Sequence, residues 1–127
     1  VCCLYLESKI VKKDSWKEGP WRECKVRFVN EELKKSFEGL KETNPQLHKE
    51  IERAFSSICH DAFFGRRVKK ELIPKKLIKD YDINNLFIYN LSEGWRLIYS
   101  LVNENIEVIS IVLDWMNHKD YERLFKF

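Results

Sequence analysis

Hydrophobic residues are most concentrated in the last third of the chain, where they form three short runs. Two of them, Trp95 to Val102 and Ile106 to Leu113, are rich in aromatic, aliphatic and β-branched residues, which favour strands. The polar residues 103 to 105 between them are typical of a short turn. The third run, Leu86 to Leu91, comes just before, and Gly94 can adopt the positive φ that a three-residue hairpin loop needs. The pattern predicts a three-stranded antiparallel meander.

Upstream of the meander, the spacing of the hydrophobic residues changes to that of helices. Cys24 to Val29 still alternates like a half-buried strand. Asn30 then caps a helix whose first turn holds two glutamates, and Asn44 with Pro45 repeats the start signal. The two predicted helices have apolar stripes, which are Leu33, Phe37 and Leu40 in the first and Leu47, Ile51, Ala54, Phe55 and Ile58 in the second. Such close amphipathic helices predict an antiparallel hairpin packed on the sheet.

The segment Phe63 to Asn85, between the helices and the meander, is rich in cations. They are Arg66, Arg67, Lys69, Lys70, Lys75 and Lys76. Pro74 is expected to open a short helix that carries Leu77 and Ile78 inward. The cluster fits a rim that binds RNA phosphates, because lysine and arginine provide the sequence-independent affinity for nucleic acid. It fits a solvated basic connection equally well.

Length and composition limit the class of protein. At 127 residues and 15.4 kDa, the chain is expected to hold one domain, 23–127, preceded by an N-terminal extension, 1–22, of unknown role. Within the extension, Cys2 to Leu6 fits a short strand and Lys9 to Pro20 a loop. No stretch approaches the roughly 20 apolar residues of a membrane span. We expect a soluble, cytoplasmic protein without a membrane partner, and the net charge of +3 does not by itself indicate nucleic acid.

The cysteines and two of the histidines are interpreted as structural. Cys2, Cys3, Cys24 and Cys59 contain no CxxC pair, although folding could gather them with His60 into a metal site. Structural zinc sites usually have paired ligands a few residues apart. We therefore predict reduced, partly buried thiols and no metal or other cofactor, and we place His48 on an exposed helical turn.

The order of the predicted elements carries a resemblance to a known family. It is a strand, two helices, a basic connection, a meander that contains GWRLIY at residues 94–99, and a C-terminal HKDYERLF at residues 118–125. From about Cys24 to the end, this resembles the RelE/ParE superfamily of type II toxins. The resemblance implies a small α+β domain with an antiparallel or mixed sheet of about four strands, an N-terminal helical hairpin packed on it and a short C-terminal helix.

The resemblance also implies a function. Toxins of the RelE-like branch cleave messenger RNA in the ribosomal decoding site and are held inactive by a cognate antitoxin. The reaction would need no metal, because the ribose 2′-hydroxyl attacks the adjacent phosphate and leaves a cyclic phosphate. It needs a base for that hydroxyl, a cation for the charge on the phosphorane oxygens and an acid for the leaving 5′-oxygen.

Three residues match positions of the family's site. Arg96 stands at the position of the family arginine, and its planar fork suits two phosphate oxygens, although it could be an ordinary solvent-facing strand residue. His118 could be the acid or base, since histidine exchanges a proton near neutral pH, or it could be a cap. Tyr121 matches the family's C-terminal tyrosine, which could stack a base, orient the 2′-hydroxyl or only dock the last helix.

Three positions depart from the family pattern. Phe87 and Tyr89 stand where RelE-like toxins have lysines, and Trp115 stands where a second arginine is expected. The basic segment could supply the missing cations, and the aromatic residues could stack on bases. Equally, they could be core residues or contacts to the antitoxin, which we expect to dock by coupled folding on apolar side chains of the sheet and the C-terminal helix.

Three classes of function therefore stay open. The first is an endoribonuclease toxin that needs Arg96 and a proton-transfer partner. The second is a ParE-like toxin that cleaves no RNA and binds a protein target such as DNA gyrase. The third is an inactive binding module with the same fold. The presence of His118 together with the basic segment favours the first class.

Overall fold

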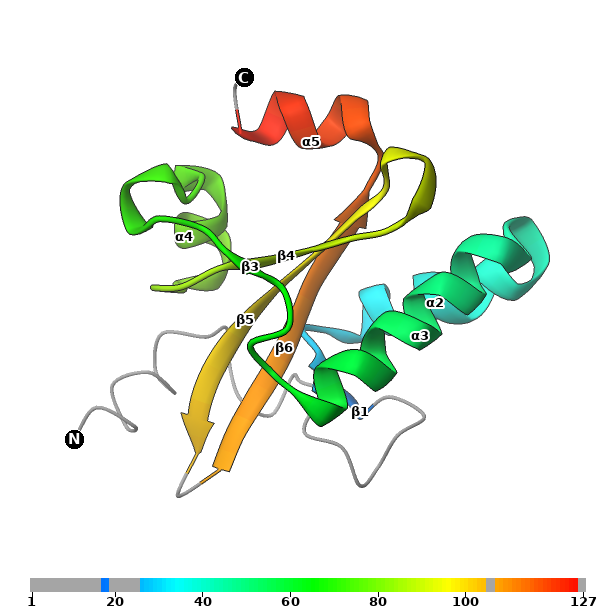
Figure 1. The fold of residues 1–127 in the computed structure, drawn as a ribbon, viewed down its shortest axis with the longest axis horizontal. Helices are drawn as coiled ribbons and strands as arrows, with labels where there is room; N and C mark the ends of the chain where they lie inside the picture. The colour runs from blue at the N-terminus through cyan, green and yellow to red at the C-terminus, as the bar shows by residue number, and fades with distance from the viewer. Residues whose placement is uncertain (1–16, 19–25, 105–106, 126–127) are drawn as a thin grey trace.

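A computed structural model describes residues 17–18, 26–104 and 107–125 (Figure 1). These residues form a six-stranded sheet in the order β1-β2-β6-β5-β4-β3. The strands are β1 (Lys17–Glu18), β2 (Val26–Phe28), β3 (Arg66–Arg67), β4 (Phe87–Asn90), β5 (Arg96–Glu104) and β6 (Glu107–Met116). The helices are α2 (Glu31–Thr43), α3 (Pro45–His60), α4 (Lys75–Tyr81) and α5 (His118–Phe125), with short 3₁₀ turns η2 (Lys70–Leu72) and η3 (Ser92–Gly94).

The sheet is mixed, because β2 runs parallel to β6 whereas the other neighbouring strands are antiparallel. The predicted α+β class is confirmed, but the count of about four strands is wrong. Two-residue strands at the edges, β1 and β3, are too short to leave an alternating pattern in the sequence. The helices also differ from the hairpin and C-terminal helix that the resemblance implies, because a further helix, α4, lies between β3 and β4, where Pro74 was expected to open a short helix.

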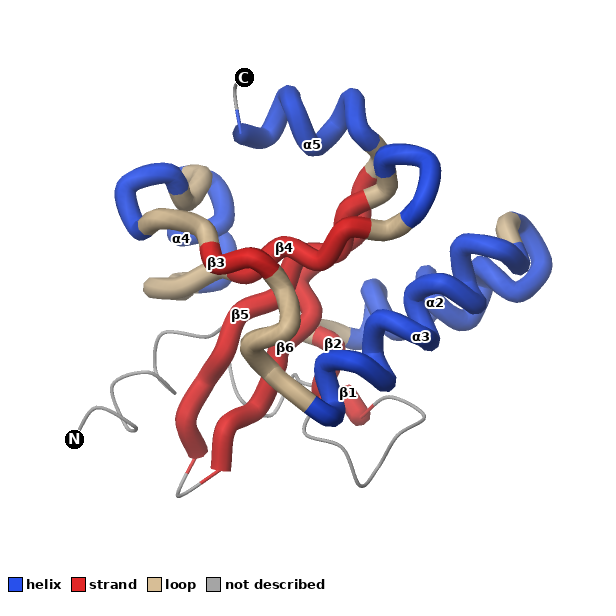
Figure 2. The backbone as a smooth tube through the Cα atoms, in the orientation of Figure 1, coloured by secondary structure: helices blue, strands red, loops and turns tan. Residues whose placement is uncertain are grey.

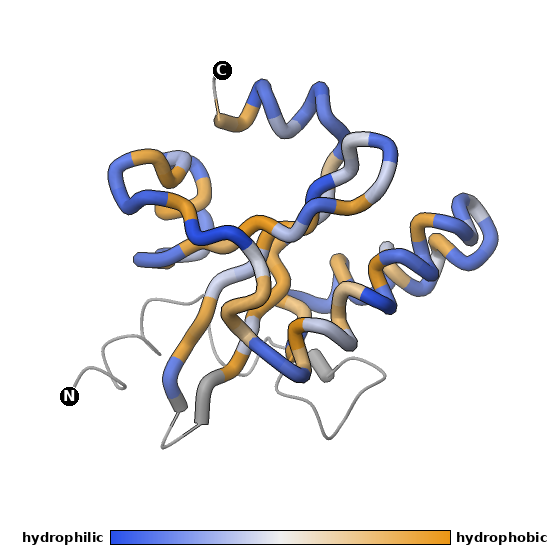
Figure 3. The backbone as a smooth tube through the Cα atoms, in the orientation of Figure 1, coloured by the Kyte–Doolittle hydropathy of each residue, from blue (hydrophilic) through white to orange (hydrophobic). Residues whose placement is uncertain are grey.

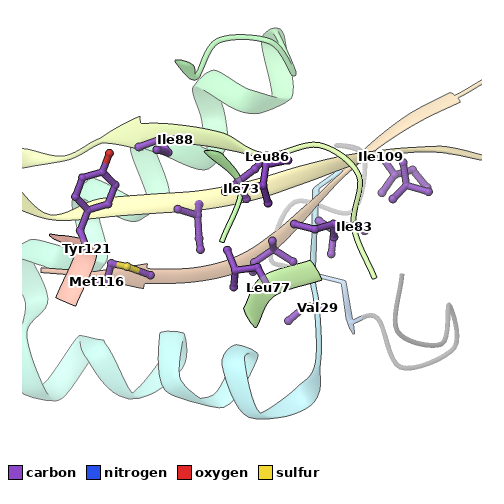
Figure 4. Packing of buried hydrophobic residues seen from close by; sticks show 13 residues of the cluster. Val29, Ile73, Leu77, Ile83, Leu86, Ile88, Ile109, Met116 and Tyr121 are labelled. Carbon is purple, nitrogen blue, oxygen red and sulfur yellow. The ribbon is translucent and has the colours of Figure 1, made fainter. Parts of the chain in front are cut away.

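Helices cover both faces of the sheet, which gives the domain two cores. The hairpin α2–α3 packs on one face, where Phe55 contacts Phe28 with ring centroids 5.6 Å apart. The helices α4 and α5 pack on the other face (Figures 1 and 2). Tyr121 and Met116 lie at one end of this second core and Ile109 at the other (Figure 4). Because side chains alternate along a strand, each of the long strands β5 and β6 contributes to both cores.

The predicted starts of the helical hairpin are confirmed. Asn30 Oδ1 accepts a hydrogen bond from Leu33 N–H at 2.8 Å, and Asn44 Oδ1 accepts one from Leu47 N–H at 3.3 Å. Side-chain acceptors at these positions satisfy N–H groups that have no partner within the helix. All five predicted apolar residues of α3 are buried.

Two predicted orientations are wrong. His48 is 5% exposed rather than surface-lying, because it belongs to the buried side of α3 and stacks on Phe37 of α2 with ring centroids 4.4 Å apart. In α4, Leu77 is buried as expected, but Ile78 is 38% exposed. A seven-residue helix turns only one narrow side toward the core, and Ile78 is one step of about 100° away from it.

The turns of the meander were predicted in part correctly. Gly94 has the expected positive φ of 79°, and a Cβ atom there would lie 3.0 Å from the Cβ of His118. The polar segment 103–105 does not end the strand where predicted, because Asn103 and Glu104 still pair with Val108 and Glu107. Cross-strand pairing extends the ladder beyond the apolar run.

Several expectations concern residues outside the described part of the chain. They include the strand Cys2 to Leu6, the cysteines Cys2, Cys3 and Cys24, and the extension 1–22 except for Lys17 and Glu18 in β1. Cys59 is disulfide-bonded, so the prediction of reduced thiols is wrong for this residue. Within residues 17–18, 26–104 and 107–125, no helix is long and apolar enough to cross a membrane.

Tyr99 of β5 fixes the turn that leads from α3 to β3. Its side chain is fully buried, its hydroxyl donates to Ala62 C=O at 2.9 Å, and it accepts from Gly65 N–H at 2.9 Å. Burial raises the pKa of this hydroxyl, which therefore keeps the proton that it donates. A Cβ atom at Gly65 would lie 2.7 Å from the Tyr99 oxygen, so the contact requires glycine.

Removing this hydroxyl is expected to destabilise the fold. Tyr99→Phe leaves Ala62 C=O and Gly65 N–H without their partner, and should lower the free energy of unfolding by about 1 to 3 kcal/mol. Urea denaturation measures the change. The matched control is Tyr89→Phe, whose hydroxyl makes one long contact, 3.4 Å, to Ser57 Oγ and should lose less than about 1 kcal/mol. Equal losses in the two variants would contradict a special role for Tyr99.

Candidate active site

Two arginines from different strands meet at Tyr121 of α5. The guanidinium carbon of Arg96 lies 5.2 Å from the centroid of the Tyr121 ring, within the range of a cation–π contact. Arg66 Nη2 donates a hydrogen bond to the Tyr121 hydroxyl oxygen at 3.2 Å. Strands β3 and β5 and helix α5 therefore bring together three polar side chains that are far apart in the sequence.

The register of the sheet explains why the two arginines lie on the same face. Arg66 pairs with Ile88 of β4, and Ile88 pairs with Ile98 of β5, two residues after Arg96. Directly paired residues point to the same side of a sheet, and so do residues two apart along one strand. The helix α5 begins just after β6 and places Tyr121 over this face.

Arg96 keeps unused hydrogen-bonding capacity. Its Nη1 donates to the neighbouring Trp95 C=O at 3.2 Å. Its Nε is buried, and no acceptor for it exists among the residues that the structure describes. The guanidinium is always charged and only partly buried, so it is suited to an anion such as a phosphate group, although Nε itself is closed to a ligand.

Tyr121 has little ring surface left for a ligand. It is 6% exposed, its ring contacts Arg96, and the ring of Phe125 lies 4.7 Å away between centroids. Tyr121 thus docks α5 on the core, one of the roles expected from the sequence. Stacking of a base would require α5 to move, which leaves the hydroxyl as the part of Tyr121 that can act on a ligand.

His118 lies against the loop that leads into Arg96 and faces solvent. It is the first residue of α5, its side chain is 60% exposed, and its Nε2 is 3.0 Å from Glu122 Oε1. The close approach of Gly94 to the Cβ of His118 places the loop before Arg96 directly against the start of α5. The imidazole is therefore accessible, and Glu122 orients it.

The six basic residues do not form one rim. Arg66, Arg67 and Lys69 line a cavity of about 280 Å³ that also contacts Tyr121. Lys70, with Arg67, lines another of about 360 Å³. Lys75 and Lys76 belong to α4, where Lys76 lines a third pocket, of about 570 Å³, between α4, β6 and α5. Of the six cations, Arg66 is the one with a hydrogen bond to Tyr121.

The aromatic residues at the three departing positions have different environments. Phe87 is a core residue that stacks on Tyr99 with ring centroids 5.4 Å apart. Tyr89 is half-buried beside it. Trp115 pairs with Leu97 and contacts Phe37 of α2 edge-on, 6.3 Å between centroids, so it faces away from Arg96.

The pocket of about 570 Å³ contains titratable residues that the sequence analysis missed. Asp114 pairs with Ile98 and lies on the face of Arg96. Burial raises the pKa of the Asp114 carboxyl and Asp120 adds to the increase, whereas the Trp115 N–H and Lys76 lower it. Burial also raises the pKa of the Tyr81 hydroxyl, and the negative charge of Asp114 raises it further. The available signal was an acid inside an otherwise apolar strand.

Within the described ranges, no group of three or more His, Cys, Asp or Glu side chains could hold a metal ion. No family model, curated protein or solved structure matches the chain. Membership of the RelE/ParE superfamily therefore stays a prediction, and the geometry around Tyr121 is what supports a function.

The raised pKa of Asp114 predicts a pH-dependent effect of its neutralisation. Asp114 keeps its proton to higher pH in the folded state than in the unfolded chain. The stability that the neutral carboxyl contributes to the fold is therefore fully present below pH 3.8, the ordinary pKa, and is lost as the pH rises through the pKa of the folded state. Because the Asp114 side chain is exposed and solvent screens its charge, Asp114→Asn should be only slightly more stable than the parent chain at pH 7, by less than about 1 kcal/mol, with a difference that disappears below pH 3.8.

Urea denaturation at both pH values measures this difference. Asparagine keeps an oxygen for the Trp115 N–H, which now binds Asp114 Oδ1 at 2.8 Å. A variant that is less stable than the parent at pH 7 would mean that the attraction of Lys76 outweighs the cost of burying the carboxylate.

Proposed function

We propose that the chain is an endoribonuclease toxin that cleaves messenger RNA without a metal, through attack of a 2′-hydroxyl on the adjacent phosphate. The observation that carries the proposal is the meeting of Arg96 and Arg66 at the hydroxyl and ring of Tyr121. Two guanidinium groups close to one hydroxyl suit a phosphodiester, because each fork can bind a pair of phosphate oxygens.

Each arginine has its own part in the proposed reaction. Arg96 binds the non-bridging oxygens through its Nη groups, since Nε is buried, and stabilises the charge that develops on them. Arg66 is exposed and supplies a second cation. It replaces the lysines that the family pattern would place at Phe87 and Tyr89. The Tyr121 hydroxyl, held by Arg66, orients the reacting ribose.

In this proposal His118 exchanges one of the two protons that the cleavage reaction moves. The reaction takes a proton from the 2′-hydroxyl and gives one to the leaving 5′-oxygen. His118 is exposed, is oriented by Glu122 and adjoins the loop that leads into Arg96. An exposed imidazole beside this loop can reach a bound strand without a change in the fold.

A cognate antitoxin and the ribosome are the proposed partners. The helices α2, α3, α4 and α5 cover both faces of the described sheet, so a docking segment would meet α5, the loops and the edge strand β3 rather than an open sheet face. Displacement of α5 would separate Tyr121 from both arginines and move His118. An antitoxin that binds α5 would thereby inactivate the site without contacting Arg96.

Cleavage is expected to depend on Arg96 and His118. In a cell-free translation reaction with primer extension on the messenger, the parent chain should cut within codons. Arg96→Ala should slow cutting by about 10²- to 10³-fold and His118→Ala by about 10²-fold or more. Arg53→Ala, which removes an exposed arginine of α3, is the matched control and should cut normally.

The other outcomes separate the remaining classes. Intact messenger with arrested translation would contradict the nuclease and favour a toxin that binds a protein target. Undisturbed translation would favour an inactive binding module.

The hydroxyl of Tyr121 is expected to matter for the rate more than for the fold. Tyr121→Phe keeps the buried ring and its contact with Arg96 but removes the acceptor of Arg66. Cleavage should fall by about 10-fold, the effect of one hydrogen bond of about 1.4 kcal/mol. Unfolding should change by less than about 1 kcal/mol. A variant with the parental cleavage rate would mean that Tyr121 only docks α5.

A further inference from the structure

The turn between α3 and β3 exposes two adjacent phenylalanines. Phe63 is 60% exposed and Phe64 is 58% exposed. Each contacts an aromatic residue of β4: Phe63 meets Phe87 edge-on, 5.9 Å between centroids, and Phe64 stacks on Tyr89 at 5.4 Å. Neighbouring large apolar side chains in solvent are a mark of an interaction surface.

The backbone beneath these rings is fixed before any ligand binds. Phe63 N–H donates to Asp61 Oδ1 and Phe64 N–H donates to Asp61 C=O, both at 3.0 Å. Gly65 N–H donates to the buried Tyr99 hydroxyl. The loop is the tan segment between α3 and β3 in Figure 2. A preorganised loop lowers the entropy that binding would otherwise lose.

Cations stand directly beside both rings. Phe63, Arg67 and Lys70 line the cavity of about 360 Å³, together with amide side chains such as Asn103. Phe64 and Arg66 line a second cavity, of about 300 Å³. Figure 3 shows β3 as a hydrophilic segment next to the more hydrophobic β4. Each exposed ring therefore has an arginine beside it, on the edge strand of the sheet.

We infer that Phe63, Phe64, Arg66, Arg67 and Lys70 form a binding surface for single-stranded nucleic acid. The two rings stack on successive bases and the cations hold the phosphates, the combination by which proteins bind single strands without sequence preference. The rings rest on Phe87 and Tyr89, which are two residues apart along β4 and so about 6.7 Å apart. This inference concerns binding alone and does not require cleavage at Arg96.

Charge favours nucleic acid over an apolar protein partner. An apolar surface that covered the two rings would also take three cations out of water, which is costly when they are not paired. A nucleic-acid strand offers bases to the rings and phosphates to the cations at the same time. Asp61, the acid in the turn, uses its carboxylate on the Phe63 N–H.

Binding of short labelled oligonucleotides to the full chain, followed by fluorescence anisotropy, tests the inference. The probes are a uridine 12-mer, its 2′-O-methyl form, which cannot undergo 2′-hydroxyl attack, and a thymidine 12-mer. Phe64→Ala should lower the affinity for any probe that the parent chain binds by about 5- to 100-fold. Phe64→Leu should lower it similarly, because leucine cannot stack on a base. Phe64→Trp should keep the affinity.

Matched controls distinguish base stacking on the two rings from nonspecific apolar binding and from the proposed cleavage reaction. Ile78→Ala removes a side chain of α4 that is 38% exposed and lies outside the cavities that β3 and the two phenylalanines line, and it should bind as the parent does. Arg67→Ala should weaken binding and lower the salt dependence by about one ion. A parent chain that binds the 2′-O-methyl probe but leaves the messenger intact would contradict the proposed nuclease and leave this inference standing.

The contrary results are equally specific. Absence of binding to all three probes at low salt, or full affinity in Phe64→Leu, would overturn the inference. So would sedimentation showing self-association that Phe64→Ala abolishes, because the rings would then belong to a protein contact. Preference among RNA, its 2′-O-methyl form and DNA identifies the strand that the surface accepts.

Discussion

The hydroxyl of Tyr99 is the contact on which the functional side of the molecule depends. It lies in the middle of β5, inside the core under the hairpin α2–α3, and it binds both Ala62 C=O and Gly65 N–H. Those two bonds set where the chain leaves α3 and enters β3 as an edge strand of only two residues. Because Arg66 follows Gly65 directly, the reach of Arg66 to Tyr121 depends on the same hydroxyl. A buried bond thus positions an exposed cation.

The alternation of side chains along β5 places the structural hydrogen bonds and the candidate active site on opposite faces of the sheet. Tyr99 faces the helical hairpin, whereas Arg96 faces α5. The two residues of strand β3 also point to opposite faces of the sheet. Arg66 reaches Tyr121 on one face, and Arg67 lies 5.9 Å from the Phe87 ring on the other. With helices over both faces, the described sheet offers ligands its β3 edge and the ends of its strands. The candidate active site and the exposed phenylalanines therefore lie on either side of one edge strand.

Local signals in the sequence predicted the parts of the fold that local interactions determine. The caps at Asn30 and Asn44 and the buried stripe of α3 depend on residues three or four positions away, and these were correct. The two-residue strands and the distribution of the six cations over several cavities depend on distant neighbours, and no periodicity reports them. His48, by contrast, lies three residues before Ile51 and seven before Phe55, so helical spacing placed it on the buried stripe and its polar type alone suggested exposure. The proximity of Arg96 and Tyr121 followed only from the family resemblance. Nothing in the sequence distinguished Arg66 from the five other cations, and the position of Asp114 in an apolar strand was the one unused sign that its pKa is raised.

The loop before Arg96 carries backbone strain next to the proposed site. Glu93 has a φ of 54°, a left-handed conformation that typically costs a residue other than glycine about 1 kcal/mol or more. Glu50 of α3 compensates by accepting hydrogen bonds from Ser92 N–H at 2.9 Å and Ser92 Oγ at 2.6 Å. The held loop then packs Gly94 against His118. Strained backbone persists where surrounding contacts impose it and is commonest at functional sites, so this outlier supports a site at the start of α5 independently of the family resemblance.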